Sequence, residues 1–387
     1  MGKNLKGKEI GKNLTQRKDG RYEAKYVDQF GRRHTICDPK LAVVRKKLNE
    51  ALYNKEHSIY SSECKLTLDE WFNIWVNTYY KNKVKEITYI NKVDRYNGKI
   101  KGSSIGKMKL VDIRPIHIQE YVNSLKEANL KQGTIGIYIS LIRAPLKQAI
   151  LEGYITRNPV DGISIPRDDY KEKLVLTHEE QERFFKYASI SSLYKLYKFL
   201  LLTGVRINEA LALTWDDVDF DTKIIRINKT LHCYSGRQKQ MLKDLNAEES
   251  THLEYRVGTP KTRQSIRNIP ISECCYTLLK EMEAENKLNI NIVFHNKRGA
   301  FLNVNNVDYS LKKICSQIIA TEDANFPLIT PHTFRHTFTT RCIERGVSPK
   351  VIQKVLGHAT LDMTLKIYTH VTDQYLTEEM SKINIEI

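Results

Sequence analysis

The sequence predicts a multidomain α+β protein. A small three-stranded sheet with one helix comes first, then an all-helical domain, then a mainly helical mixed α/β domain. The chain has 387 residues, which is too many for one ordinary hydrophobic core. Strand-like segments separated by turn residues are confined to residues 14–37 and 223–271, and helical periodicity dominates elsewhere. We therefore expect domains at residues 1–62, 63–168 and 169–387.

The N-terminal domain is predicted as three strands followed by a helix. The strand segments "LTQR", "RYEAKYV" and "RRHTIC" are separated by "KDG" and "DQFG", which place a glycine in each hairpin bend. Asp38 and Pro39 then indicate a helix start, with Asp38 as the cap and Pro39 in the first position. Basic residues alternate along the strands. Such a sheet either lies in a DNA groove or exposes a solvated outer face.

The second domain is predicted to be all-helical. Thr67 followed three residues later by Glu70 is the capping-box pattern, and it opens a segment rich in aromatic residues. Further helices are expected at about residues 87–97, 115–128 and 132–152. The segment "RNPVDGISIPRDDYKEKL" follows, with two prolines, a glycine and many charges. This composition is typical of a linker between domains.

The third domain is predicted to mix helices with a few strands. Thr177 and Glu180 repeat the capping pattern, and a buried helix, "SLYKLYKFLLLTG", ends at Gly204. Two strand-like segments, "KIIRINKT" and "RNIPI", flank a long polar insertion at residues 231–258. We expect this insertion to be a mobile loop or extension. Mainly helices follow to about residue 381.

The net charge of +17 is distributed unevenly along the chain. Residues 1–63 carry +7 and residues 64–170 carry +6, whereas the remaining residues carry only +4. A basic surplus gathered in the first 170 residues indicates a polyanionic partner. A merely soluble basic surface is the alternative on charge alone.

Cysteine usage and hydropathy indicate a cytoplasmic protein. The seven cysteines form no CxxC pair, so we expect reduced thiols and no cysteine-based zinc site. No stretch approaches the run of about 18 apolar residues that a membrane helix needs. The N-terminal segment has charge but no apolar stretch after it, so we expect no secretory signal.

The segment "HTFRH" at residues 332–336 raises the question of a metal site. Two histidines four apart form half of a zinc-protease helix, but that helix needs a glutamate as general base where Thr333 stands. Thr330 and Pro331 instead indicate a helix start, which puts His332 in the positively polarised first turn. His332 and Arg335 share a face. The segment therefore predicts anion binding rather than metal binding.

Two other segments carry residues suited to the same chemistry. "TGVRINEAL" places Arg206 after a buried helix, with Glu209 three residues on, and "SPKVIQKVLGHATLDMTLKIYTH" contains His358 and Tyr368. Taken alone, each of these residues has an ordinary structural explanation. Arg206 would pair with Glu209, His358 would cap a turn, and Tyr368 would be a surface or core residue. Lys261, in "TPKTRQSIRNIPI", would be a solvated lysine.

Taken together, these segments resemble the tyrosine recombinase (phage integrase) family. The marks are an arginine in G-x-R-x-x-E, a hairpin lysine, H-x-x-R-H, L-G-H, and a tyrosine ten residues after that last histidine. They occur here in order over residues 174–370. The upstream layout resembles integrases of conjugative transposons and lambda-like phages. That resemblance implies an arm-type DNA-binding domain at 1–62, a core-binding domain at 63–168 and a catalytic domain at 169–387.

The resemblance implies a role for each candidate residue. Arg206 and Arg335 would clamp the scissile phosphate, and His358 would donate a hydrogen bond to it. Lys261 would protonate the departing 5′ oxygen, with Lys239 and Lys243 as rivals in the insertion. His332 would be the base and Tyr368 the nucleophile, because a phenol needs activation at neutral pH. Asn208 stands where the family usually has Gly or Ser, which bears on local packing.

The implied function is a site-specific integrase that inserts and excises a mobile element. A 3′-phosphotyrosyl link retains the energy of the broken bond, so no ATP is expected, and two arginines with imidazoles can stabilise the charge on the phosphate without a metal. The implied partners are double-stranded DNA with core-type and arm-type sites, three further copies in a tetramer, an excisionase and a host DNA-bending protein. The C-terminal segment would contact a neighbouring protomer or pack in cis. Nucleoid association would follow. The alternatives are a type IB topoisomerase and a DNA-binding regulator without catalysis.

Overall fold

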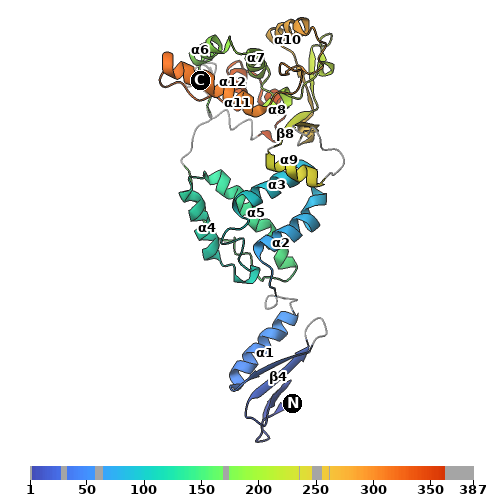
Figure 1. Cartoon of the computed structure of the whole chain (residues 1–387), viewed down its shortest axis with the longest axis vertical. Helices are drawn as coiled ribbons and strands as arrows, with labels where there is room; N and C mark the ends of the chain where they lie inside the picture. The colour runs from blue at the N-terminus through green and yellow to red at the C-terminus, as the bar shows by residue number, and fades with distance from the viewer. Residues whose placement is uncertain are drawn as a thin grey trace, which may run out of the picture. The chain divides into compact units, whose positions relative to one another are not determined.

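The computed structural model describes residues 2–27, 33–56, 64–168, 174–234, 236–245, 255–260 and 262–361 (Figure 1). The chain divides into two compact units, Met1–Asp169 and Tyr170–Ile387. The expected α+β class is confirmed, because small sheets accompany mostly helical segments. The division into three domains stays a prediction.

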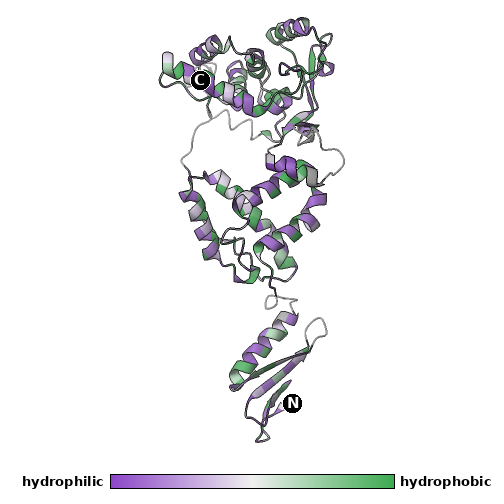
Figure 2. Ribbon diagram, in the orientation of Figure 1, coloured by the Kyte–Doolittle hydropathy of each residue, from purple (hydrophilic) through white to green (hydrophobic). Residues whose placement is uncertain are grey.

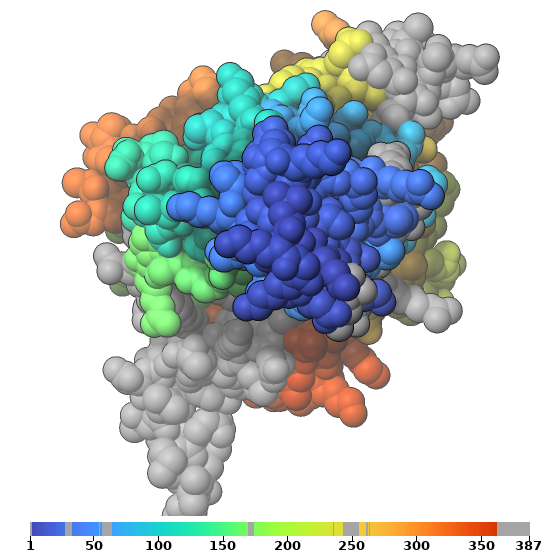
Figure 3. Space-filling view, turned by 90° about the horizontal axis from the view of Figure 1, so that it is seen from below, coloured from blue at the N-terminus to red at the C-terminus, as the bar shows by residue number. Residues whose placement is uncertain are grey.

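The first unit begins with a small sheet covered by a helix. Strands β3, β4 and β5 pair antiparallel in that order, and helix α1 packs on them around Leu14, Ala24 and Val44. The surface of these N-terminal elements is coloured blue in Figure 3. The bounds are β3 Leu14–Gln16, β4 Tyr22–Val27, β5 Arg33–Asp38 and α1 Leu41–Glu56. The three predicted strands and the helix are confirmed. The "DQFG" turn lies outside the described residues.

Two local details differ from expectation. Asp38 is the last residue of β5, and α1 begins at Leu41 instead of Pro39. The Asp38 carboxylate still accepts a hydrogen bond from the backbone N–H of Lys40 at 2.8 Å, so it stabilises the bend before the helix. Two more strands, β1 (Gly2–Lys3) and β2 (Glu9–Gly11), pair with each other. Strands this short carry no periodic pattern that a sequence could reveal.

Helices make up the rest of the first unit, and polar and apolar residues interleave along them (Figure 2). The capping box before α2 is confirmed: the backbone N–H of Glu70 donates to Thr67 Oγ1 at 3.2 Å, and that of Thr67 donates to Glu70 Oε2 at 2.8 Å. A π-helical turn, Val76–Tyr80, extends α2. The other predicted helices are also confirmed, with bounds α2 Leu68–Trp75, α3 Glu86–Lys99, α4 Pro115–Glu127 and α5 Gln132–Leu151.

The second unit has one large core between helices and a three-stranded antiparallel sheet of order β10-β7-β6. Rings of Phe184, Tyr197 and Phe334 pack against one another and join α6, α7 and α12. The helices are α6 His178–Ala188, α7 Tyr194–Thr203, α8 Ile207–Ala210, α10 Glu273–Glu285, α11 Val304–Thr321, α12 Pro331–Glu344 and α13 Pro349–Leu356. The strands are β6 Val218–Asp219, β7 Ile224–Ile227 and β10 Arg267–Pro270.

The insertion at 231–258 is more regular than predicted. Strands β8 (Thr230–Cys233) and β9 (Tyr255–Gly258) pair antiparallel, and helix α9 (Gly236–Leu245) lies between them in the sequence. Leu231 and Leu242 are fully buried. Of the two alternatives, a mobile loop or an extension, these residues form an extension with secondary structure of its own, because buried leucines anchor a segment that is otherwise polar.

Two further observations concern the chain as a whole. All seven cysteines are free thiols. No helix in the described part of the chain combines the length and the apolar character that a membrane crossing requires.

Candidate active site

The first arginine of the site follows a helix that ends abruptly. Helix α7 stops at Gly204, whose φ of 62° is left-handed and suits glycine. A Cβ at this position would lie 2.4 Å from Phe338 Cδ1, so the backbone approaches α12 more closely than any side chain permits. The chain then turns, and Arg206 becomes the N-cap of α8. Its side chain is 31% exposed and therefore reaches the surface.

The second arginine is held in the core by helix α12. Phe334 is fully buried and Arg335 beside it is only 5% exposed. Arg335 Nη1 donates to the carbonyl of Gly204 at 2.8 Å, and Nη2 donates to the carbonyl of Leu356 at 2.8 Å. Arg335 thus joins the end of α7 to the end of α13, and these two bonds use two of the five N–H groups of an arginine.

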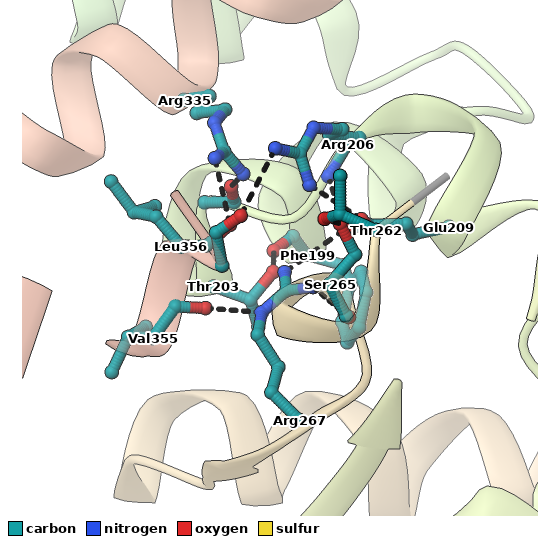
Figure 4. Close-up of polar contacts among 12 residues, drawn as sticks. Phe199, Thr203, Arg206, Glu209, Thr262, Ser265, Arg267, Arg335, Val355 and Leu356 are labelled. Atoms are coloured by element: carbon teal, nitrogen blue, oxygen red, sulfur yellow. Dashed lines mark hydrogen bonds and ion pairs between the residues drawn. The ribbon is translucent and has the colours of Figure 1, made fainter. Parts of the chain in front are cut away.

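Three consecutive carbonyls at the end of α13 accept hydrogen bonds from three different arginines (Figure 4). Arg267 donates through Nε to Val355, Arg335 donates to Leu356, and Arg206 Nη2 donates to Gly357 at 3.4 Å. The last carbonyls of a helix lack partners within it and carry partial negative charge, so guanidinium groups satisfy them well. The end of α13 therefore collects positive charge from three distant parts of the chain.

His358 follows directly after this helix end. Gly357 caps α13 with a φ of 65°, and the buried His358 donates its backbone N–H to the carbonyl of Gln353 at 3.1 Å. The turn thereby fixes His358 next to the carbonyl that Arg206 contacts.

Glu209 is the buried carboxylate of this cluster. Its Oε1 accepts from Arg206 Nη1 at 2.8 Å, and its Oε2 accepts from Arg267 Nη2 at 2.9 Å. Burial alone would raise the pKa of this carboxyl, but the hydrogen bonds and charges of the two arginines outweigh burial and hold the pKa below its usual value. Glu209 therefore stays ionised.

Positive charge exceeds negative charge within the site. Among the described residues, Glu209 is the one carboxylate that contacts Arg206, Arg267 or Arg335. Burial and the nearby Arg206 lower the pKa of Arg335 to about 9, which still leaves it cationic at neutral pH. Since buried charges are normally paired, this excess indicates a binding place for an anion.

His332 lies in the first turn of α12 and shares the field of these arginines. Partial loss of hydration lowers its pKa below the ordinary 6.5, and the charges of Arg335 and Arg206 lower it further, while Asp308 opposes the shift. Its imidazole is therefore neutral near pH 7, the form that can accept a proton.

This shift predicts the pH dependence of DNA cleavage. The family resemblance implies that His332 is the base, and protonation at low pH would remove that base, so cleavage at subsaturating DNA should fall as the pH drops through a midpoint below 6.5. Single-turnover cleavage rates between about pH 5 and pH 8 measure this decrease. In His332→Gln, we expect the rate to lose this dependence on pH. The same decrease in that variant would assign the titration to another group.

The six candidate residues differ in what the structure says of them. Arg206, His332, Arg335 and His358 come together around the end of α13. Lys261 and Tyr368 lie outside the described residues. The rivals Lys239 and Lys243 belong to α9 in the insertion.

Sequence reasoning missed Arg267. A usable signal was present, because Arg267, Ile269 and Ile271 are spaced two apart, which places them on one face of β10 and its continuation, and both isoleucines are buried. An arginine on the apolar side of a strand is normally buried together with a partner. Here the partner is Glu209.

Asn208 departs from the family pattern and leaves a polar atom unsatisfied. Its Oδ1 is buried and has no hydrogen-bond partner among the described residues. We expect Asn208→Ala to raise the free energy of unfolding by about 1 kcal/mol, because it removes a dehydrated carbonyl. Chemical denaturation measures the change. A loss of stability would mean that the oxygen has a partner in the remaining part of the chain.

Comparison with known proteins places this site in a family. Residues 174–375 match the phage integrase family, and residues 67–126 match the phage integrase N-terminal SAM-like domain. The transposase from transposon Tn1545 of Streptococcus pneumoniae is 28% identical over 411 residues, which cover 98% of this chain and 96% of that protein. The transposase from transposon Tn916 of Enterococcus faecalis is 29% identical over 402 residues, covering 96% and 94%.

Solved structures share the fold. The Tn1549 transposon integrase in complex with transposon right end DNA has a TM-score of 0.69 at 24% identity, and the match covers 82% of this chain and 99% of that one. A lambda integrase dimer bound to a core site has a TM-score of 0.56 at 16% identity and 98% coverage of both chains. Because the family match alone spans more than half of the chain, this protein belongs to the phage integrase family and is a tyrosine recombinase, a DNA-breaking and rejoining enzyme that resembles the integrases of conjugative transposons.

Proposed function

We propose that this recombinase integrates and excises a mobile element by cleaving each DNA strand with Tyr368 at a phosphate held by Arg206 and Arg335. The observation that carries the proposal is the excess of positive charge at the end of α13. Three guanidinium groups donate to the carbonyls there, and among the described residues the single carboxylate of Glu209 pairs with two of them, so a phosphodiester is proposed as the anion that balances the charge. Two fixed cations stabilise the charge that develops on the phosphate oxygens without help from a metal.

Each step then has a residue to perform it. The phenol oxygen of Tyr368 attacks phosphorus, and the neutral imidazole of His332 accepts its proton. The bond from phosphorus to the 5′ oxygen breaks, and Lys261 gives that oxygen a proton. His358 donates a hydrogen bond to the phosphate. The product is a 3′-phosphotyrosyl link, and attack by another 5′ hydroxyl reverses the same steps to rejoin DNA.

The DNA complexes of related integrases support a proposal for how this chain assembles on DNA. The Tn1549 integrase binds transposon end DNA, and lambda integrase forms a tetramer on a Holliday junction. For this chain we propose the same kind of tetramer on DNA. In it, the domain at 1–62 would bind arm-type sites, the domain at 63–168 core-type sites, and the domain at 169–387 would cleave. An excisionase and a host DNA-bending protein would assist, on the bacterial nucleoid. The near full-length likeness to two transposon transposases favours this function over a type IB topoisomerase.

A suicide substrate tests the proposal. A nick placed beside the cleavage point in the element's own end sequence lets the cut fragment diffuse away, so that the covalent adduct accumulates. The unmodified chain should form the adduct, and Tyr368→Phe should bind the DNA in an equally salt-sensitive complex without forming it. An adduct in Tyr368→Phe would reject Tyr368 as the nucleophile. Relaxation of supercoils without strand exchange between duplexes would favour the topoisomerase.

A modified leaving group tests Lys261 separately. A sulfur atom in place of the bridging 5′ oxygen departs without a proton, so this substrate should restore cleavage to Lys261→Ala. Lys239→Ala serves as the matched control and should cleave the ordinary DNA normally. Full activity of Lys261→Ala on ordinary DNA would move the acid role to another lysine.

A further inference from the structure

Arg267 is the arginine of the cluster in which each of the three side-chain nitrogens donates to a group of the protein. Nε donates to the carbonyl of Val355, Nη1 donates to the carbonyl of Ser265 at 3.0 Å, and Nη2 donates to Glu209 at 2.9 Å. Figure 4 shows the side chain rising from β10 toward the end of α13. All three nitrogens are engaged and the side chain is only 6% exposed, so Arg267 is not placed to bind the phosphate itself.

The contacts of Arg267 connect segments that carry the proposed catalytic groups. Ser265 belongs to the short turn after Lys261, Val355 lies three residues before His358, and Glu209 contacts Arg206. The packing leaves little freedom, because a Cβ on Gly357 would come within 3.1 Å of Arg267 Cδ. A displacement of Arg267 would therefore displace the neighbouring elements as well.

The shared carboxylate gives Arg267 an electrostatic effect as well. Glu209 lies between two arginines, so its single negative charge is divided between them. Without Arg267, Glu209 would pair with Arg206 alone. That stronger pair would draw the Arg206 guanidinium toward the protein and reduce its net positive field. Arg206 is the more exposed of the two partners, with 31% of its side chain accessible, and its contact with the Gly357 carbonyl is long, at 3.4 Å.

We propose that Arg267 is a positioning residue for strand cleavage, which holds Glu209 so that Arg206 stays directed at the scissile phosphate. This inference rests on the proposed function, because it assumes that Arg206 contacts the phosphate. Arg267 acts through Glu209 and makes no contact with DNA. Removing it slows the chemical step and leaves the affinity for DNA almost unchanged.

The test compares Arg267→Met with a matched arginine on the suicide substrate. Arg341 is partly buried, donates to the carbonyl of Leu176 at 2.8 Å and pairs with Glu344, and within the described part of the chain it makes no hydrogen bond or ion pair with Arg206, Glu209 or Arg335. At a temperature where both variants are folded, Arg267→Met should form adduct about a hundredfold more slowly, since displacement of a positioned group by about 1 Å costs that much. Arg341→Met should react at the unmodified rate. Both should bind DNA as tightly as the unmodified chain.

Two further arms identify the route through Glu209. The double variant with Arg267→Met and Glu209→Gln should form adduct no more slowly than the slower of the two single variants. Both changes break the same connection from Arg267 through Glu209 to Arg206. Arg267→Lys should restore part of the rate. The substrate with a sulfur leaving group should not rescue Arg267→Met, because the defect lies at Arg206 and not at the acid.

The outcomes separate the inference from the proposed function. If the unmodified chain forms no adduct, the proposed function is rejected together with the role of Arg267. An adduct formed by Arg267→Met at the unmodified rate rejects only the positioning role. Full rescue by the sulfur leaving group, additive losses with Glu209→Gln, or an equal loss in Arg341→Met would each overturn it too.

Discussion

Arg335→Met is expected to reduce formation of the covalent DNA adduct by about a thousandfold, the scale of losing one fixed donor to a transition-state oxyanion. The buried guanidinium is the group proposed to meet the phosphate, and it aligns the site through the carbonyls of Gly204 and Leu356. Methionine keeps most of the apolar stem and removes the charge and every donor. A lysine would keep the charge but could not reach both carbonyls and a phosphate oxygen together.

Stability should respond far less than activity to this change. Burial lowers the pKa of Arg335 to about 9 from an ordinary value of 12.5, so the folded protein holds this proton less tightly than the unfolded chain does. At neutral pH, well below both values, the charge opposes folding. Removing this charge therefore favours the folded state, which offsets the loss of the two hydrogen bonds that Arg335 donates. The melting temperature of Arg335→Met should therefore lie within a few degrees of the unmodified value.

Adduct formation on a nicked substrate and thermal unfolding, measured on the same preparations, check both parts. Arg341→Met is the control for loss of a buried arginine from α12 and should retain its activity. Cleavage by Arg335→Met at the unmodified rate would show that Arg335 does not contribute to binding the phosphate. Unfolding together with the loss of cleavage would mean that its role is mainly structural.

The local parts of this structure were predictable because their signals lie within a few residues. Thr67 with Glu70 and Thr177 with Glu180 are capping boxes that the sequence displays directly. The pairing of Arg206 with Glu209 also follows from their spacing on one helical turn. The start of α1 was misplaced by two residues because the strand before it uses Asp38.

The convergence of three arginines on one helix end could not be predicted from spacing. Arg206, Arg267 and Arg335 are separated by long stretches of chain, and only the folded core brings them to the carbonyls of residues 355–357. The family resemblance supplied two of them. The secondary structure of the insertion was not predicted for a related reason, since β8 and β9 pair across a long polar segment and the anchoring leucines are few.

Gly204→Ala is expected to be among the most damaging single-methyl changes in the second unit. Gly204 has a left-handed φ of 62°, which costs a side chain about 1–2 kcal/mol. The added Cβ would also lie 2.4 Å from Phe338 Cδ1 and 2.9 Å from Leu356 Cδ2, and such overpacking costs about 1–3 kcal/mol more. The sum, about 2–5 kcal/mol, is a large part of the stability of an ordinary domain.

The damage should extend to catalysis, because Gly204 sits between two proposed catalytic arginines. Its carbonyl holds Arg335, and Arg206 follows two residues later. Gly346→Ala is the matched control: Gly346 is also left-handed, with a φ of 72°, but an added Cβ would have no atom within 4 Å. Denaturation should show a loss of about 1–2 kcal/mol there and unchanged cleavage. Equal effects of the two alanines on both measurements would show that the close approach of α7 to Phe338 and Leu356 has no part in building the site.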